Sequence, residues 1–278
     1  MNRRMAIVLC MLMAYVAAAN AGDIRKTAEA TMLVTGSIDV APDGSVHGYS
    51  IDRPEKIPPV VVDLIKNSVP GWRFQFAERV DAVQHAKMSL RIIAKPVDDQ
   101  HEVLHLVGAS FGHAGADGAR VTYKNMQPPR YPQEAIREHV GGTVFLLLRI
   151  DRQGQVQNLA VEQVNLGSYG REAQMRHFRS VLGDAALEAA KGWTFNPPTT
   201  GKNASAPYWD MRAPVNFDPH PIGTSRADTY GKWEAYIPGP RASIPWAASN
   251  QSTSDAVPVG TLSQAEQPMQ LKTALDGA

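Results

Sequence analysis

The sequence predicts an α+β protein of two tandem units, each a small antiparallel three-stranded sheet packed with a helix, followed by a C-terminal extended tail. Two observations carry this prediction. The phrase Gly-Trp-x-Phe occurs at 71–74 and again at 192–195, each time after a helix-like run. Before each run, apolar and polar residues alternate on both sides of a Gly-containing turn, which is typical of a β-hairpin.

Each unit is expected to run strand, turn, strand, helix, Gly-Trp-x-Phe and a further strand, and a unit that occurs twice indicates an internal repeat. The first unit places these elements at 36–52 (hairpin), Pro59–Val69 (helix) and Lys87–Ala94 (last strand). The second unit places them at 142–164 (hairpin), 171–191 (helix) and Tyr208–Phe217 (last strand).

The two tryptophans of the repeated phrase, Trp72 and Trp193, are expected in the core. The preceding glycine ends the helix by adopting a left-handed conformation. The Trp and the Phe two residues later then point to the same side of an extended segment and cover the small sheet. Both tryptophans therefore specify the fold and carry no chemistry.

Composition excludes a nucleic-acid footprint, because the net charge of the 278 residues is only +1. The N-terminus reads as a secretory signal peptide: Arg3 and Arg4 precede the apolar run 5–19, and small residues lead to a cut after Ala21. The alternative is an uncleaved membrane anchor, although the run is shorter than the roughly 20 residues of a spanning helix. Cys10, the single cysteine, lies in this run, so no disulfide is expected.

Changes in composition and periodicity along the chain predict six regions. Signal peptide, first unit and connecting strand or loop are followed by the second unit, an aromatic and Pro-rich extension that lies on the folded body, and a disordered tail without periodicity. Their expected limits are, in that order, 1–21, 22–97, 98–126, 127–219, 220–246 and 247–278.

One chemical motif occurs, His101-Glu102-x-x-His105, the pattern in which two His on one helix face bind zinc and the Glu acts as a base. The surrounding "EVLHLVGASF" alternates and contains β-branched residues, which favours a strand. On a strand the two His lie about 13 Å apart at roughly 3.3 Å per residue and do not share an ion. A zinc hydrolase is the alternative from another function class, and no cofactor is expected.

The strand "TVFLLLRI" is apolar on both faces, with Phe145 and Leu147 on the side opposite Val144 and Leu146. A one-sided sheet would leave that second face as an apolar patch in water, which soluble proteins cover or use. The segment with Trp233, Tyr236 and Trp246, or the first unit, is expected to cover it.

Residues 127–217 resemble the C-terminal domain of the TonB family, the periplasmic end of energy transducers of Gram-negative envelopes. The resemblance is carried by "PPRYPQEAIREHVGGTVFLLLRIDRQGQVQNLAVEQV" and "LGDAALEAAKGWTFNPPTTG". They contain, in order, the Tyr-Pro lead-in, the Gly-x-Val strand, the Asp-x-x-Gly-x-Val turn, the Ala-rich helix and Trp-x-Phe-x-Pro. Residues 28–94 resemble the same domain more loosely, with "PDGSV" and "GWRF" but no Tyr-Pro.

The resemblance implies a non-enzymatic binding module in which the final strand is an edge, and a short segment of an outer-membrane receptor pairs with it by β-augmentation. Carried onto this sequence, the partner-binding candidates are Tyr131, Pro132, Trp209, Met211, Ala213 and Val215. For the Tyr-Pro pair the alternative is a rigid lead-in that starts a helix. The expected partner is a cell-envelope protein, with self-association left open.

A family transducer has an uncleaved anchor with polar coupling residues and a long Pro-rich spacer, and this sequence has neither. The chain is therefore expected to be a periplasmic relative, with an inner-membrane transducer as the alternative. Pro207 and Pro214 bracket the expected edge strand and limit pairing or aggregation there. A proline at Met211 is expected to abolish partner pairing and leave the fold largely intact.

Overall fold

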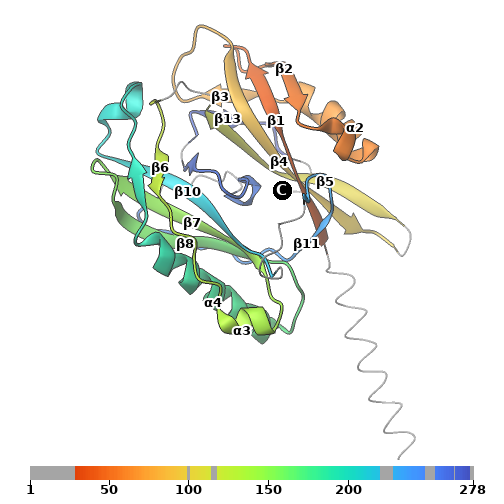
Figure 1. The fold of residues 1–278 in the computed structure, drawn as a ribbon. Coiled ribbons are helices and arrows are strands. Elements are labelled where there is room, and N and C mark those ends of the chain that lie inside the picture. Colours follow the sequence, from red (N-terminus) through yellow and green to blue (C-terminus); the bar gives the residue numbers. More distant parts are fainter. Residues whose placement is uncertain are drawn as a thin grey trace, which may run out of the picture.

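The computed structural model describes residues 29–98, 101–113, 118–219, 228–247, 254–265 and 267–275. Its two larger sheets each carry a helix on the outer side, and the C-terminal segment lies between them (Figure 1). Asp255 of this segment touches both sheets, through Arg91 of one and Asn165 of the other. The predicted α+β class is confirmed, with all described strand pairs antiparallel.

The first half contains the hairpin, helix and last strand that the sequence predicts, with a longer last strand. A further long strand follows it where the sequence predicted only a connecting strand or loop. The elements are β1 (Glu29–Val40), β2 (Val46–Ile51), η1 (Pro54–Lys56), α2 (Pro59–Ser68), η2 (Val69–Gly71), β3 (Phe74–Phe76), β4 (Gln84–Pro96) and β5 (Glu102–His113).

The second half repeats this order after a short lead-in. Its last strand has the predicted limits. The elements are β6 (Thr122–Asn125), α3 (Gln133–Arg137), β7 (Gly142–Asp151), β8 (Val156–Leu166), α4 (Glu172–Ala190), β9 (Thr194–Asn196), η3 (Lys202–Ser205) and β10 (Tyr208–Phe217).

The C-terminal part is ordered where the sequence predicted a disordered tail, so that prediction was wrong for 254–265 and 267–275. Its segments pair with the earlier strands and bury Ala256, Val257 and Met269. The burial of these few apolar side chains, together with backbone pairing, orders a composition that is otherwise rich in Ser, Gln and Pro. The elements are β11 (Glu234–Tyr236) in the predicted extension and, in the predicted tail, η4 (Ser254–Ala256), β12 (Ser263–Gln264) and β13 (Met269–Leu271).

Strand order is the same in the two larger sheets. One reads β2-β1-β4-β5, with β11 also paired to the start of β1, and the other reads β8-β7-β10-β12. In both, the hairpin strands are followed by the last strand of the unit and then by one added strand. The expected three-stranded sheets were therefore too small, because β5, β11 and β12 add to the edges of the predicted sheets.

Both hairpin turns require glycine for the same physical reason. Gly44 and Gly154 have φ of 82° and 77°, a region that L side chains rarely adopt. A Cβ on either would lie 2.1 Å from a carbonyl oxygen, that of Phe74 or Phe195. The same phenylalanines donate their N–H to the glycine carbonyls over 2.8 Å, so each turn is fastened to the Trp-x-Phe strand.

The repeated tryptophans are core residues, as predicted. Trp72 is 3% exposed and meets Phe111 edge to face at 6.0 Å between ring centroids. Trp193 is 2% exposed, and its indole N–H donates to the Gln127 carbonyl over 2.8 Å. Each fills the space between its sheet and helix in one of the two hydrophobic clusters.

The second apolar face of β7 is covered, which confirms the prediction for Phe145 and Leu147, both 1% exposed. The extension crosses this side of the sheet. The Trp246 carbonyl accepts from Arg149 of β7, and the Ala242 N–H donates to the Glu162 carbonyl of β8. The predicted extension thus lies on the folded body.

The signal peptide, its cut after Ala21 and the anchored alternative fall in 1–28, outside the described residues. Among the residues that the structure does describe, every helix is too short or too polar to span a bilayer.

Candidate functional site

The strand β10 lies between β7 and the short β12. It pairs with β7 along its whole length, from Tyr208 with Asp151 to Phe217 with Gly142. On its other edge, among the described residues, the paired strand is β12, where Met211 faces Gln264 and Arg212 faces Ser263. The outer edge of β10 is therefore occupied in part by the chain's own C-terminal segment, whereas the sequence predicted a free edge.

The backbone of β10 faces its two neighbours alternately. Ala265 donates its N–H to the Asp210 carbonyl over 2.8 Å, so the even-numbered residues of β10 turn their N–H and C=O toward β12. Pro214 fits this register, because a proline is tolerated where the missing N–H would face an edge. Asp210 and Arg212 are thus the residues whose backbone faces the C-terminal segment on this edge.

The strand residues named from the sequence have the other parity. Their N–H and C=O face β7, and their side chains are buried in the hydrophobic cluster that also contains Phe178 and Leu182 of α4. Partner binding through these residues stays a prediction. The backbone groups that β10 presents to a neighbouring strand on this edge are those of Asp210 and Arg212. The four residues are Trp209, Met211, Ala213 and Val215.

Tyr131 and Pro132 lie near the far end of β10. The Tyr131 hydroxyl donates to the Val140 carbonyl over 2.9 Å, and its ring meets Phe217 edge to face at 5.5 Å. Burial, with the negative charge of Asp218, raises the pKa of Tyr131 to about 12, so the hydroxyl stays protonated and donates. Pro132 is the N-cap of α3, and partner binding through Tyr131 and Pro132 stays a prediction.

A buried ion pair lies beneath the point where β12 joins β10. Arg212 of β10 donates to both carboxylate oxygens of Glu162, over 2.8 and 3.1 Å, and Arg241 adds a bond of 2.8 Å. Burial alone would raise the pKa of Glu162, but these bonds and charges outweigh it and lower the pKa. Arg212 also donates to the Ala265 carbonyl over 3.0 Å, which joins the ion pair to the C-terminal segment.

A second charged group sits at the start of β10. Arg149 forms a bidentate pair with Asp210, with both bonds 2.8 Å. Its guanidinium also lies 3.8 Å from the Tyr208 ring centroid and donates to the Trp246 carbonyl over 2.7 Å. The side chain of Asp210 is therefore held inside the protein, and only its backbone faces the edge.

The His-Glu-x-x-His motif lies at the start of β5 and in an extended conformation, as the alternation predicted. His101 is exposed and bonded to Asp98, with Nδ1 2.8 Å from the carboxylate, while His105 is opposite Ile93 of β4. Within the described ranges, no three His, Cys, Asp or Glu side chains are grouped to hold a metal ion.

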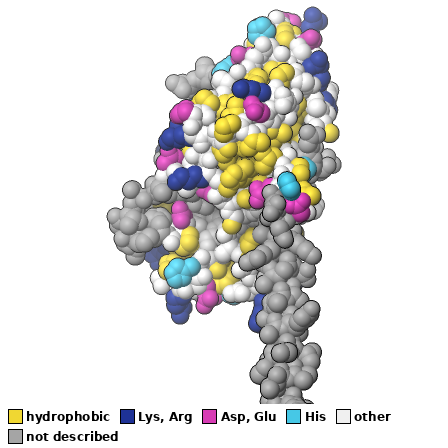
Figure 2. Space-filling view, turned by 90° about the vertical axis from the view of Figure 1, so that its right-hand side faces the viewer, with side chains coloured by type: hydrophobic (Ala, Val, Ile, Leu, Met, Phe, Trp, Pro, Cys, Tyr) yellow, Lys and Arg dark blue, Asp and Glu magenta, His cyan; other side chains and the backbone are white. Residues whose placement is uncertain are grey.

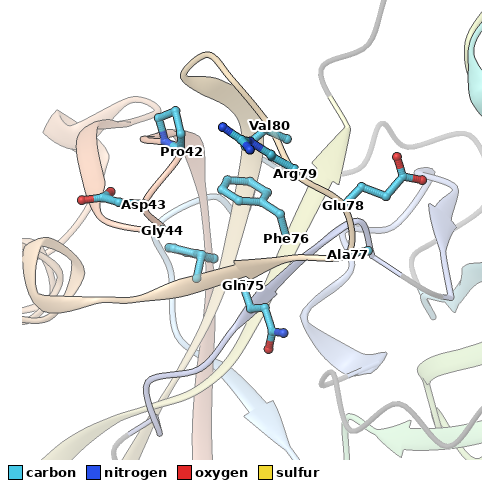
Figure 3. Close-up of a pocket in the computed structure, with 10 residues that line it drawn as sticks. Pro42, Asp43, Gly44, Gln75, Phe76, Ala77, Glu78, Arg79 and Val80 are labelled. Atoms are coloured by element: carbon cyan, nitrogen blue, oxygen red, sulfur yellow. The ribbon is translucent and has the colours of Figure 1, made fainter.

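The described surface includes two open hollows lined by charged residues. One, of about 330 Å³, is lined by the turn 42–44 and by 74–80, with Phe76 near its centre (Figure 3). The other, of about 390 Å³, lies between α3 and α4, where His177 is 3.0 Å from Glu134. None of the residues that line either hollow belongs to β10.

Apolar side chains also gather over the first half, on the side of α2 and β5 (Figure 2). These elements carry the exposed Val60 and Val103 and the partly buried Leu64 and Leu104. This face is separate from β10, which belongs to the second half.

Comparison with known proteins finds a family resemblance for part of the second half. Residues 127–165 match the family described as Gram-negative bacterial TonB protein C-terminal. Two relatives from strains of Xanthomonas campestris pv. campestris, each called Protein TonB, are 37% identical to this chain over 97 residues. That stretch is 35% of this chain and 37% of each relative. No solved structure matches the chain.

The resemblance to the TonB C-terminal domain family is thereby confirmed for the region that contains β7 and β8. The looser copy at 28–94 stays a prediction.

Proposed function

We propose that this chain is a non-enzymatic, TonB-like protein of the Gram-negative envelope that binds an extended segment of a partner by strand addition at β10. The observation that carries the proposal is the 37% identity to two proteins called TonB, over 97 residues. As in the family that it resembles, the partner is a segment of an outer-membrane receptor, and the role is related to energy-coupled transport.

Strand addition suits the geometry of β10. Trp209, Met211, Ala213 and Val215 point into the core, so side chains on that face do not reach a partner. The backbone of Asp210 and Arg212 faces outward and already pairs with a strand in β12. Main-chain bonds give affinity in this mode of recognition, and side-chain pockets only tune it.

We interpret the first half as a diverged copy of the same unit. Its sheet has the same strand order, and its turn glycine contacts the Trp-x-Phe strand in the same way. The edge that corresponds to β10 is that of β4, which pairs with β5 from Ala86 to Pro96. The first half is thus covered along nearly all of this edge, whereas the second half is covered only at β12, and we assign the binding role to the second.

The experiment is site-specific photo-cross-linking in the bacterial envelope. A photoreactive phenylalanine replaces Tyr208 at the start of β10, and the matched control carries it at Val103 of β5. These positions are 42% and 44% exposed, so the two probes differ in location and hardly in accessibility.

We expect the Tyr208 probe to yield a cross-link to an outer-membrane protein, identified by mass spectrometry, and the Val103 probe to yield none to the same protein. Equal cross-linking from both positions, or none from Tyr208 in an exported and folded chain, would overturn the assignment of β10 as the binding edge.

A further inference from the structure

The C-terminal segment is anchored firmly on one side of β12. Arg91 of β4 donates through Nε to the Asp255 carbonyl over 2.7 Å, and the Tyr236 hydroxyl donates to the Asp255 carboxylate. Ala256 and Val257 that follow are 0% and 4% exposed. This end of the segment is fixed between the two sheets.

The segment is anchored again on the other side. Gln267 donates to the Ser110 hydroxyl over 3.1 Å and accepts from the Phe111 N–H over 3.3 Å. Beyond it, β13 pairs with β3, from Met269 opposite Phe76 to Leu271 opposite Phe74. Both anchors lie off the β10 edge, so neither depends on the pairing between β12 and β10.

Between the anchors the chain pairs with β10 over only a few residues. The ladder consists of Ser263 and Gln264, extended by the Ala265 N–H on the Asp210 carbonyl and by the Arg212 guanidinium on the Ala265 carbonyl. Leu262 is partly buried against the core of the second half, while Val259 is 45% exposed. By contrast, β5 covers β4 along almost its whole length. The ladder that covers β10 is therefore much shorter than the ladder that covers β4.

We propose that residues 262–265 are a removable cover of the β10 edge, which exchanges with the incoming strand while both anchors stay in place. Identifying the incoming strand as a partner's segment rests on the proposed function; the cover itself does not. The edge can pair with one strand at a time, because each outward N–H and C=O of Asp210 and Arg212 serves one ladder.

The cover also indicates which strand the edge accepts. It runs antiparallel to β10 and places an apolar residue, Leu262, against the core. It places a small residue, Ala265, where its carbonyl receives the Arg212 guanidinium. An incoming strand of the same chemistry has an apolar residue, two polar residues and a small residue in that order.

A tethered cover competes strongly, because a short linker gives it an effective concentration in the millimolar range. The apparent affinity of an incoming strand is the intrinsic affinity multiplied by the fraction of molecules that are uncovered. Weakening the cover therefore strengthens the binding of a strand added in trans.

The test uses a fluorescent peptide of residues 258–268 added to the full chain, with binding followed by fluorescence anisotropy. Ser263→Pro removes an N–H that faces β10, since Ser263 and Ala265 share a parity. The matched control is Gln264→Pro, whose lost N–H faces away from β10. We expect Ser263→Pro to bind the peptide at least about tenfold more tightly than the wild type does, and Gln264→Pro to bind it like the wild type.

A disulfide lock keeps the test decisive if Ser263→Pro fails to fold. Met211 and Gln264 are opposite one another at a pair without ladder hydrogen bonds, where Cβ atoms approach most closely. Met211→Cys with Gln264→Cys, in a Cys10→Ser background, should bind the peptide only after reduction.

Equal peptide binding by the oxidised and reduced forms, or no gain in a folded Ser263→Pro chain, overturns the removable cover. If the peptide results hold but the envelope cross-link at Tyr208 is absent, the cover stands and the proposed function fails. If the cross-link is present without the peptide results, the proposed function stands and the cover fails.

Discussion

The second hairpin packs closely against its Trp-x-Phe strand because residue 154 is a glycine and has no side chain. Gly154→Ala would place Cβ 2.1 Å from the Phe195 carbonyl oxygen and hold a φ of 77°. We expect a loss of more than about 1 kcal/mol in the free energy of unfolding, measured by urea denaturation. Gly71→Ala is the control, because its Cβ meets nothing within 4 Å and Gly71, contrary to the left-handed conformation predicted from the sequence, does not have a positive φ. Equal losses at Gly71 and Gly154 would contradict this account of the turn.

The carboxylate of Glu162 keeps the guanidinium of Arg212 paired in the interior, where they are 5% and 3% exposed. Glu162→Gln leaves that cation without its counter-ion, and we expect it to lower the free energy of unfolding by about 3–5 kcal/mol at pH 7.

The pH dependence of this stabilisation follows from the sign of the pKa shift. The pKa of Glu162 lies below its ordinary value of 4.5 in the folded chain. The contribution is thus complete above pH 4.5 and is lost as the pH falls below it. As the pH is lowered, the difference in stability between the wild type and Glu162→Gln, measured by thermal melting, should disappear. A difference in stability that does not change with pH would refute the assignment.

Individual residues were predictable from the sequence where local rules decide them. The glycines of both turns and the two core tryptophans follow from turn chemistry and amphipathic patterning. The pair between Glu162 and Arg212 joins two strands 50 residues apart, and no spacing rule connects them. Both residues lie in strands, and the alternation of polar and apolar residues does not show which side chain pairs with which.

At the scale of elements, the register of β10 reverses one prediction made from the sequence. Met211 turns its N–H toward β7, so Met211→Pro removes a bond inside the sheet and leaves the edge donors in place. We expect this variant to be destabilised by about 1–3 kcal/mol, measured by urea denaturation. Gln264→Pro, whose N–H faces away from the sheet, should retain wild-type stability. A Met211→Pro chain as stable as the wild type would show that the register is wrong.

The limits of β10 were predicted correctly, while its neighbour β12 was missed. The alternation in Tyr208–Phe217 spans a whole strand, which is long enough for a period of two to be recognised. The strand β12 has two residues within a stretch rich in Ser and Gln, and its pairing is set by the anchors at Asp255 and Gln267. The sequence also did not show which residues of β10 turn their backbone toward β12. That follows from the hydrogen bond that the Ala265 N–H donates to the Asp210 carbonyl.

At the scale of the whole molecule, the two halves are held together by a polar layer that no local pattern encodes. Asp255 accepts from groups on both sheets and from Tyr236. Burial of the Tyr236 hydroxyl, together with the nearby charge of Asp255, raises the pKa of Tyr236 above its ordinary value. The hydroxyl therefore stays protonated and donates. The sequence predicted that the apolar face of β7 is covered, but not that the C-terminal segment lies between the sheets.

The location of the chain in the cell is tested at its N-terminus. Export with cleavage after Ala21 predicts a mature protein that begins at Gly22, measured by mass spectrometry of the intact protein from the periplasmic fraction. A chain that retains residues 5–19 and sediments with the inner membrane would contradict cleavage and favour the anchored transducer.

The central claim, recognition by strand addition at β10, is tested most directly by amide hydrogen exchange. The full chain is measured with and without a peptide of the partner segment that the Tyr208 probe cross-links. A partner strand that pairs with Arg212 must replace Ser263, so the Ala265 amide should exchange faster while the Arg212 amide stays protected. Unchanged protection of Ala265 at saturating peptide would contradict strand addition at this edge.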